Sequence, residues 1–354
     1  MTHRERALAP FLRRGMDRFP MWYGGDAETT GNIRKALGAA SDDEALYGIL
    51  DLDYKTIRPR YSGSAPGKNE AGQDLTEWHI ARGGYHYGQA LSFPLKGVES
   101  VAEVGAWQGC PDPADYTVKL TKEELDWARD YCLIGGVWAP FFHDAVDLVS
   151  MEDLFILMAT NEGVAHALIE KCFSVYYEID RRVFEANPGL IDMYFIGNDF
   201  GSQRDLLMSP EMWRRFFKPY VKKLIEQAKK NGCVTAIHSC GDISLVIRDL
   251  IEIGVEAINP IQVNARHMDP AKLAREFKDD CVFFGGIDEN ELLLHGEPGE
   301  VRRETRRIID TLGAWKRYIV AASHDYLLPE VPAANIIAMF DEAKNTGLVS
   351  NLFR

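Results

Sequence analysis

The sequence predicts an α/β protein built as a (β/α)8 TIM barrel with an irregular N-terminal extension. Residues 131–350 alternate apolar strand patterns with helical patterns at least six times, which is typical of a parallel sheet. A length of 354 residues suits one decorated barrel domain spanning 1–354, with 1–130 as its decorated part. An open doubly wound sheet is the alternative. No strand pattern is followed by Gly-x-Gly-x-x-Gly, and no Gly-Lys-Ser/Thr element is present, so the common reasons for an open sheet are missing.

The first 130 residues are the less regular part. An apolar segment at 18–22 precedes a glycine turn, and a helix is predicted from about residue 42 to 51. Residues 54–90 mix Arg, Tyr, Gly and Pro with short alternating stretches, which predicts a β-hairpin or an excursion rather than a separate domain. The Thr121–Glu124 capping-box pattern predicts a helix that begins near residue 122.

Strands and helices then follow one another in a regular rhythm. Strands are predicted at 137–142, 193–197, 233–238, 256–260, 281–284 and 318–322. Helices are predicted at 151–184 (one or two helices), from 210 to a glycine at 232 with Ser209 as the cap, at 245–253, after 269–270, and at 289–295, 299–312 and 332–344.

The most informative stretch is 232–242, in which a short strand ends in His238-Ser239-Cys240-Gly241. Residues two apart on a strand share a face, so His238 and Cys240 project together from the end of that strand. An imidazole nitrogen and a thiolate sulfur, held side by side, are ligands that Zn²⁺ prefers. Two ligands do not make a site, and the pattern alone is more often structural than metal-binding.

Other strand ends add to this pair, because the chemistry of a barrel lies at the carboxyl ends of its strands. We expect His238, Cys240 and His324 to supply three protein ligands to a tetrahedral zinc with one open position, as in catalytic zinc sites. Asp325 and His267 are alternatives for the third ligand, and Asp325 has a second reading as the carboxylate that orients His324. The polar strand ends are 198–199, 238–240, 259–262, 288 and 323–325.

Further residues near these ends are assigned catalytic or substrate-binding roles. Asp199 and Asp288 are predicted to position the substrate or to donate a proton to a leaving oxygen. Asn198 and Gln262 are predicted to contact the substrate. Each of three of these residues also has a structural interpretation. Asp199 and Asp288 could cap helices, and Gln262 could hydrogen-bond the backbone.

Two aromatic residues of the first apolar segment, Trp22 and Tyr23, are predicted to line the pocket, with a place in the core as the alternative.

Composition and charge exclude several classes of function. A formal net charge of −13 argues against nucleic acid or an anionic membrane as the main partner. No stretch is long and apolar enough for a membrane span, and the start of the chain has no signal-peptide core. The six cysteines are scattered without a disulfide spacing, which predicts reduced thiols and a cytoplasmic location.

These motifs resemble the uroporphyrinogen decarboxylase superfamily over roughly residues 15–350. The resemblance implies a (β/α)8 barrel, in agreement with the alternation of strands and helices. The segments that carry it are 198–203, 208–219, 238–241, 285–288, 323–324, 329–332 and 335–336.

Two branches of the superfamily differ at informative places. The decarboxylases of the superfamily share an Arg-Gln-Ala-Gly-Arg stretch near the N-terminus. The corresponding residues 21–25 of this chain are Met-Trp-Tyr-Gly-Gly, without an arginine pair. A substrate with eight carboxylates needs such cations, so porphyrinogen decarboxylation is not expected. The cobamide-dependent methyltransferases carry His-x-Cys-Gly, as at 238–241. In the coenzyme M methyltransferases of this branch the third zinc ligand resembles a cysteine near the last strand. This chain has Ser-His-Asp at the corresponding residues 323–325. That departure shifts the expectation towards methyl ethers, as in O-demethylase systems.

The resemblance therefore implies a zinc-dependent methyltransferase that moves a methyl group between a small methyl ether or thiol and the cobalt of a corrinoid. No Asp-x-His-x-x-Gly cobalamin pattern occurs, so the corrinoid is expected on a partner protein. The alternatives are a metal-free decarboxylase or lyase acting on a different acid, and a non-catalytic binding or corrinoid-handling protein. Superfamily members are often dimers, and the sequence leaves a homodimer open.

Overall fold

The computed structural model describes residues 1–39, 43–84 and 88–346. Seven parallel strands form one curled sheet in the order β1-β6-β7-β8-β9-β10-β11. Consecutive strands of this series are neighbours, as the barrel topology requires. Their bounds are Tyr54–Thr56 (β1), Cys132–Gly135 (β6), Met193–Gly197 (β7), Val234–His238 (β8), Ala257–Asn259 (β9), Val282–Phe284 (β10) and Tyr318–Ile319 (β11).

The segment around Met21 occupies the eighth strand position. Met21 forms a parallel bridge with Val320. The backbone N–H of Trp22 donates to the carbonyl of Val320 at 3.0 Å, and that of Asp53 donates to the carbonyl of Met21 at 3.0 Å. The segment therefore lies between β11 and β1 and joins the two edges of the sheet, which confirms the predicted TIM-barrel class.

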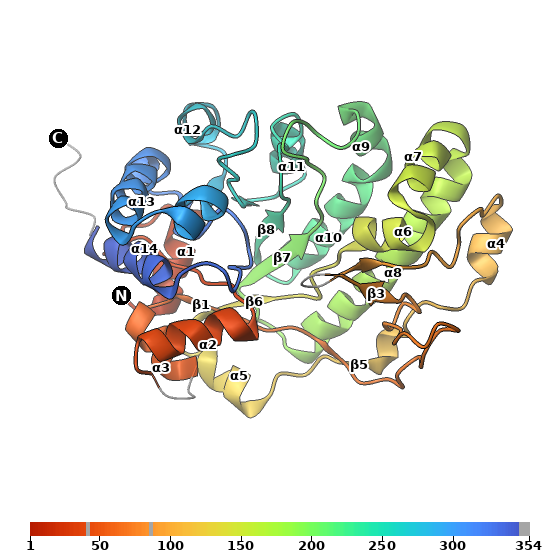
Figure 1. Cartoon of the computed structure of the whole chain (residues 1–354), viewed down its shortest axis with the longest axis horizontal. Helices are drawn as coiled ribbons and strands as arrows, with labels where there is room; N and C mark the ends of the chain where they lie inside the picture. Colours follow the sequence, from red (N-terminus) through yellow and green to blue (C-terminus); the bar gives the residue numbers. More distant parts are fainter. Residues whose placement is uncertain (40–42, 85–87, 347–354) are drawn as a thin grey trace.

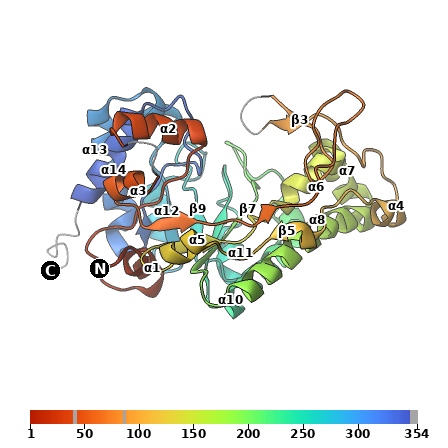
Figure 2. The ribbon, with the colours of Figure 1, turned by 90° about the horizontal axis from the view of Figure 1, so that it is seen from below.

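Helices surround the strands. In Figure 1 and Figure 2, α2, α3, α13 and α14 gather on one side of the sheet, and α4, α6, α7 and α8 lie on the opposite side. None of the helices in the described ranges has the length and low polarity needed to cross a bilayer. The helices are His3–Leu12 (α1), Ala27–Ala36 (α2), Asp43–Leu50 (α3), Val101–Ala106 (α4), Lys122–Trp127 (α5), Phe141–Val149 (α6), Met151–Thr160 (α7), Glu162–Ala186 (α8), Pro210–Phe216 (α9), Lys218–Lys230 (α10), Ile247–Glu252 (α11), Pro270–Phe277 (α12), Pro298–Leu312 (α13) and Ala333–Asn345 (α14).

Smaller elements complete the fold. A π-helix spans Glu289–Leu293, and 3-10 turns span Pro113–Asp115 and Gly313–Trp315. Two short antiparallel pairs decorate the N-terminal part: β2 (Arg60–Tyr61) with β5 (Tyr116–Thr117), and β3 (Arg82–Gly83) with β4 (Gln89–Ala90). The prediction of a hairpin or excursion at 54–90 fits the short antiparallel pairs but is wrong for Tyr54–Thr56, which form the barrel strand β1.

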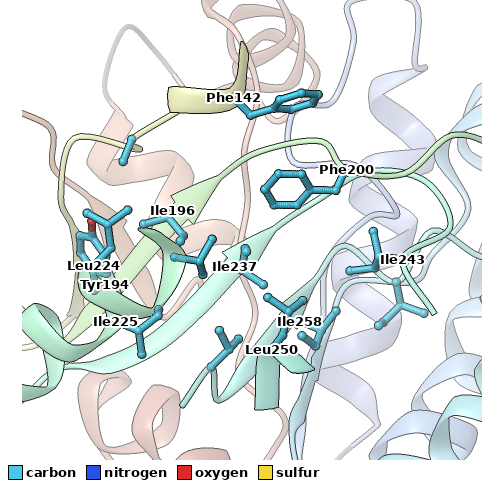
Figure 3. Packing of buried hydrophobic residues seen from close by; sticks show 14 of the residues in the cluster. Phe142, Tyr194, Ile196, Phe200, Leu224, Ile225, Ile237, Ile243, Leu250 and Ile258 are labelled. Carbon is cyan, nitrogen blue, oxygen red and sulfur yellow. The ribbon is translucent and has the colours of Figure 1, made fainter. Parts of the chain in front are cut away.

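Side chains of the strands alternate between two packed layers. On β7, Phe195 belongs to the cluster inside the barrel, whereas Ile196 belongs to the layer between strands and helices. Figure 3 shows that outer layer, with Ile237 and Leu250 among the side chains that fill it. Because Ile237 points outward, the period of two turns its neighbour His238 towards the barrel interior.

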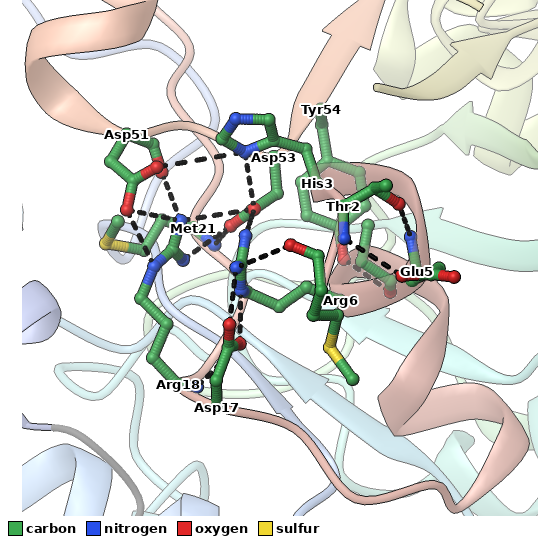
Figure 4. Close-up of polar contacts among 12 residues, drawn as sticks. Thr2, His3, Glu5, Arg6, Asp17, Arg18, Met21, Asp51, Asp53 and Tyr54 are labelled. Carbon is green, nitrogen blue, oxygen red and sulfur yellow. Dashed lines mark hydrogen bonds and ion pairs between the residues drawn. The ribbon is translucent and has the colours of Figure 1, made fainter. Parts of the chain in front are cut away.

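A buried cluster of charges lies at the amino ends of the strands (Figure 4). Asp53, which precedes β1, is fully buried. Its carboxylate accepts from Nη1 of Arg6 at 2.8 Å, Nη1 of Arg18 at 2.6 Å and the backbone N–H of Met21 at 2.8 Å. A buried carboxylate is tolerated when such donors replace its water. The cluster thereby joins α1 and the eighth strand segment to β1.

Several predicted elements differ from the observed ones. The strand predicted at 137–142 is wrong. Strand β6 already ends at Gly135. Trp138 and Ala139 have left-handed backbone conformations, with φ of 71° and 46°, and α6 begins at Phe141. Short apolar runs do not distinguish a strand from the start of a helix, which explains the error.

Other boundaries shift less. The stretch predicted at 151–184 forms two helices, and the helix predicted from Pro210 is divided into α9 and α10. Ser209 caps it as predicted, since its hydroxyl accepts from the N–H of Met212. Helices α1 and α2 were not predicted. The predicted start of α3 at residue 42 lies outside the described residues.

Candidate functional site

Three metal-ligand side chains meet at the carboxyl ends of β7 and β8. The donor atoms of Asp199, His238 and Cys240 all lie within 4.8 Å of one another. Nε2 of His238 is 3.4 Å from the sulfur of Cys240 and 3.3 Å from Oδ1 of Asp199. Pairing of Gly197 with His238 across the two strands places Asp199 at this height. We refer to these three residues as the triad.

Hydrogen bonds from the backbone and from a neighbouring strand orient the triad. Nδ1 of His238 lies 2.8 Å from the amide oxygen of Asn259 on β9. Since an amide oxygen only accepts, Nδ1 carries a proton, and Nε2 is the nitrogen that faces the triad. Oδ1 of Asp199 accepts from the N–H of Cys240 at 2.8 Å, and His143 of α6 accepts from the N–H of Asp199 at 2.9 Å.

The charges within the triad stabilise one another. Burial raises the pKa of the Cys240 thiol, but the charge and hydrogen bond of His238, together with the neighbouring His324, outweigh burial, so the pKa is lowered. Burial lowers the pKa of His238, yet the charges of Asp325 and Cys240 and the hydrogen bond to Asp199 raise it well above its usual value. The thiol is therefore biased towards thiolate, the form that ligates metals.

His324 and Asp325 lie next to the triad. The ring centre of His324 is 6.2 Å from that of His238, and its Nδ1 lies 3.0 Å from the carbonyl oxygen of Tyr326. The neighbouring Cys240 and the charge of Asp325 outweigh burial and raise the pKa of His324 to about 9. Oδ1 of Asp325 is 3.5 Å from Nδ1 of His324 and 3.9 Å from Nε2 of His238. His324 as the third ligand stays a prediction, and the tightest cluster in the described residues has Asp199 in that place.

His267, the other alternative, is engaged elsewhere. Its Nδ1 lies 2.6 Å from Oδ2 of Asp242, and its backbone N–H donates to the same oxygen. Asp242 in turn accepts from the N–H of Ser244. The structure thus places His267 on a loop held by Asp242 and outside the triad.

The remaining polar candidates hold the backbone. Asp288 accepts from the N–H groups of two residues of the π-helix and from the side chain of Asn264, so it acts as a cap. Asn198 is fully buried and bonds the backbone of Phe142 and Ala139. Oε1 of Gln262 accepts from the N–H of Gly241. In the described part of the chain these contacts are separate from the triad, and the catalytic or substrate-binding roles predicted for them stay predictions.

The two predicted aromatic residues lie in different layers. Trp22 packs inside the barrel, with its ring 5.2 Å from that of Phe284. The hydroxyl of Tyr23 bonds that of Thr30, 2.9 Å away, in the outer layer. A Cβ at Gly24 would lie 1.9 Å from the carbonyl oxygen of Asp325, so this segment packs directly against the loop of the last strand.

A family model described as "Uroporphyrinogen decarboxylase (URO-D)" matches residues 108–346. The chain belongs to the uroporphyrinogen decarboxylase (URO-D) family. That match includes every residue of the triad and the 324–325 loop, and confirms the resemblance drawn from the motifs.

Relatives of this URO-D protein have two kinds of activity. A uroporphyrinogen decarboxylase of Thermus thermophilus is 26% identical over 249 residues, which cover 68% of this chain and 66% of that protein. The methylcobamide:CoM methyltransferase MtbA of Methanosarcina mazei is 22% identical over 234 residues, 64% of this chain and 62% of MtbA. The chain thus spans slightly less than two thirds of the length of both relatives.

A solved structure has the same fold. A methyltransferase from Methanosarcina mazei superposes with a TM-score of 0.65 and 16% identity, over 98% of this chain and 99% of the other. The agreement over nearly the full length of both chains includes the N-terminal part that the family model does not match, so the decorated barrel is shared as a whole.

Sequence reasoning missed four residues around the triad of this URO-D protein. His143 lies in α6, directly after the stretch 137–142 that was predicted as a strand. Asn259 was identified at a strand end but was given no role. Arg58 and Trp138 lie two and three residues after the ends of β1 and β6. The rule that the loops at the carboxyl ends of barrel strands carry the site would have found both.

Proposed function

We propose that the chain is a zinc-dependent methyltransferase that moves a methyl group between a small methyl ether or thiol and the cobalt of a corrinoid. The observation that carries this proposal is the triad, in which nitrogen, sulfur and oxygen donors lie within 4.8 Å of one another. The similarity to MtbA, whose name states a methylcobamide-dependent methyl transfer, supports the same class of reaction.

The donor set fits zinc in three respects. Nδ1 of His238 is bonded to Asn259, which leaves Nε2 for a metal. The lowered pKa of Cys240 favours the thiolate. Asp199 supplies a carboxylate oxygen. The ring centre of His324 lies 6.2 Å from that of His238, and this histidine would be the fourth protein donor or would leave that position to substrate. A zinc ion held by these residues would supply Lewis acidity for activating the methyl donor or acceptor.

The composition of the donor set bears on the substrate. Histidine and carboxylate donate less electron density than thiolate, so a centre with one cysteine keeps more Lewis acidity than a thiolate-rich one. This favours the oxygen of a methyl ether over a thiol. The URO-D protein lacks the cobalamin motif Asp-x-His-x-x-Gly, so we place the corrinoid on a partner protein.

Metal binding by single variants tests the proposal. Purified protein is loaded with zinc, freed of excess metal and measured for zinc per chain. We expect about one zinc in the wild type, and loss of it in Asp199→Ala, His238→Ala and Cys240→Ala. His324→Ala tests whether this histidine is the fourth zinc ligand. Loss of zinc would indicate that it is, and retention of zinc would indicate that the position is left to substrate. His267→Ala is the matched control, because this histidine pairs with a carboxylate outside the triad and its removal is expected to leave zinc in place.

Activity then separates the two branches of the family. Zinc-loaded protein is mixed with free cob(I)alamin and a panel of aryl methyl ethers, and the conversion to methylcobalamin is followed by its absorbance. The reverse assay mixes methylcobalamin with thiols. Protein that takes up no zinc and releases CO₂ from a carboxylic acid would instead be a decarboxylase, and the proposal would be abandoned.

A further inference from the structure

Arg58 is a cation that lies near the triad and has no carboxylate partner within the described residues. It lies two residues after Thr56, the last residue of β1, at the carboxyl end of that strand, and its side chain is exposed. In the ranges that the structure describes, its guanidinium makes neither a hydrogen bond nor an ion pair. Other arginines of the N-terminal part are paired with carboxylates: Arg4 with Asp192, Arg6 and Arg18 with Asp53, Arg60 with Glu124, and Arg82 with Asp147.

The ring of Trp138 lies between this cation and His238 of the triad. The guanidinium carbon of Arg58 lies 4.7 Å from the ring centre of Trp138, and Trp138 lies 5.2 Å from the ring centre of His238. These separations of 4.7 Å and 5.2 Å place the guanidinium within about 10 Å of the His238 ring, a span that one small molecule bridges. Trp138 is fixed against β7, because a Cβ at Gly197 would lie 2.0 Å from its ring.

The surroundings keep Arg58 charged and available. Burial by neighbouring atoms lowers its pKa from the usual value, while the charges of Tyr326, Asp325 and Asp180 act in the opposite direction. An arginine remains protonated under all ordinary conditions despite such a shift. An exposed guanidinium without a carboxylate partner in the described residues is suited to a planar oxyanion, which its fork of N–H groups binds in two places.

We propose that Arg58 and Trp138 form an anion subsite, so that the small substrate carries a carboxylate or phosphate group opposite its reacting end. The fork of Arg58 binds the anionic group, the Trp138 ring packs along the body of the molecule, and the other end reaches the triad. The assignment of this molecule as the methyl-transfer substrate rests on the proposed function, whereas the subsite itself rests only on Arg58 and Trp138.

Binding of matched anionic and neutral probes tests the subsite. Isothermal titration calorimetry compares 4-methoxybenzoate, its neutral analogue 4-methoxybenzamide, and phenyl phosphate on the full chain. We expect both anions to bind the wild type more tightly than the amide. Arg58→Met, which keeps the length of the side chain and removes its charge, is expected to weaken binding of the anions at least tenfold and that of the amide less than twofold. The anion that binds more tightly indicates whether the subsite prefers a carboxylate or a phosphate group.

Arg60→Met is the matched control. Arg60 lies two residues along the chain and pairs with Glu124 at 2.9 Å, so its removal is expected to leave binding of all three probes unchanged. Equal anion affinity in Arg58→Met and the wild type would overturn the proposal. So would a wild type that binds the amide as tightly as the anions, or that binds neither anion at millimolar concentration.

Zinc content distinguishes this failure from failure of the proposed function. Arg58→Met is expected to keep one zinc per chain, because Arg58 has no contact with the triad in the described ranges. Anion binding through Arg58 in a protein that takes up no zinc would leave the subsite standing and remove the methyltransferase. If the protein takes up zinc and transfers methyl groups, but Arg58→Met does not change its affinity for anions, the methyltransferase stands and the anion subsite is refuted.

Discussion

Asn259 offers a test of how the candidate metal centre is oriented. Its amide oxygen holds Nδ1 of His238 at 2.8 Å, which sets both the tautomer and the ring direction of that histidine. Asn259→Leu keeps the approximate volume and removes the acceptor. The ring of His238 then loses its fixed orientation, and Nε2 is no longer the only nitrogen free to face Asp199 and Cys240.

The size of the effect follows from the role of this contact. Loss of an outer partner of a metal-binding histidine costs about 10–100-fold in metal affinity, or roughly 1.4–2.7 kcal/mol. The change also leaves Nδ1 of His238 as a buried donor without an acceptor, which costs about 1–3 kcal/mol of folding free energy. Part of that cost is offset, since the Nδ2 group of Asn259 is itself buried without a partner in the described part of the chain.

The assay is competition for zinc against a chromophoric chelator, at a temperature where circular dichroism shows the variant to be folded. Asn259→Asp is the control, because a carboxylate retains the acceptor at the same place, and we expect wild-type affinity or tighter. Wild-type zinc affinity in Asn259→Leu would refute the reasoning, since the orientation of His238 would then not depend on this hydrogen bond.

Three further predictions concern stability. Asp53→Ala leaves Arg6 and Arg18 facing a buried position without a carboxylate, and is expected to lower the free energy of unfolding by about 3–5 kcal/mol in urea titrations. Phe195→Ala empties part of the barrel interior and is expected to cost about 3–5 kcal/mol in the same measurement. Burial raises the pKa of Asp144 to about 7, so the folded state holds a proton that the unfolded state releases, and stability falls as pH rises from 4 to 7. The free energy of unfolding is expected to fall by about 2.7 kcal/mol between pH 5 and pH 8 because of this group, and Asp144→Asn is expected to remove that difference.

The part of the site that the sequence predicted is the part that depends on local geometry. His238 and Cys240 were found because a period of two along one strand is enough to place them together. Asp199 was found at a strand end but was expected to act on substrate. Its position within the triad depends on the register between β7 and β8, in which Gly197 pairs with His238. Register between strands is not contained in the spacing along one strand.

The residues that were missed lie where local patterns were ambiguous. Trp138 belongs to the apolar run 137–142 that resembles a strand, and His143 directly follows that run, but the left-handed backbone of Trp138 and Ala139 interrupts any strand there. Arg58 lies in a region of mixed composition without a clear period. Conversely, Asp288 was predicted at the correct strand end, yet its carboxylate caps the π-helix. A strand-end position indicates nearness to the site, but hydrogen-bond partners decide the role of the side chain.

Closure of the barrel between Met21 and Val320 has a consequence for biosynthesis. The two residues that pair there are far apart in the sequence, and β1 to β11 all lie between them in the chain. During translation the nascent sheet therefore has two unpaired edges until β11 has left the ribosome. Exposed strand edges invite pairing with other chains. Premature termination before residue 318 is thus expected to yield aggregating fragments, recovered mainly by chaperones, and not a smaller folded enzyme.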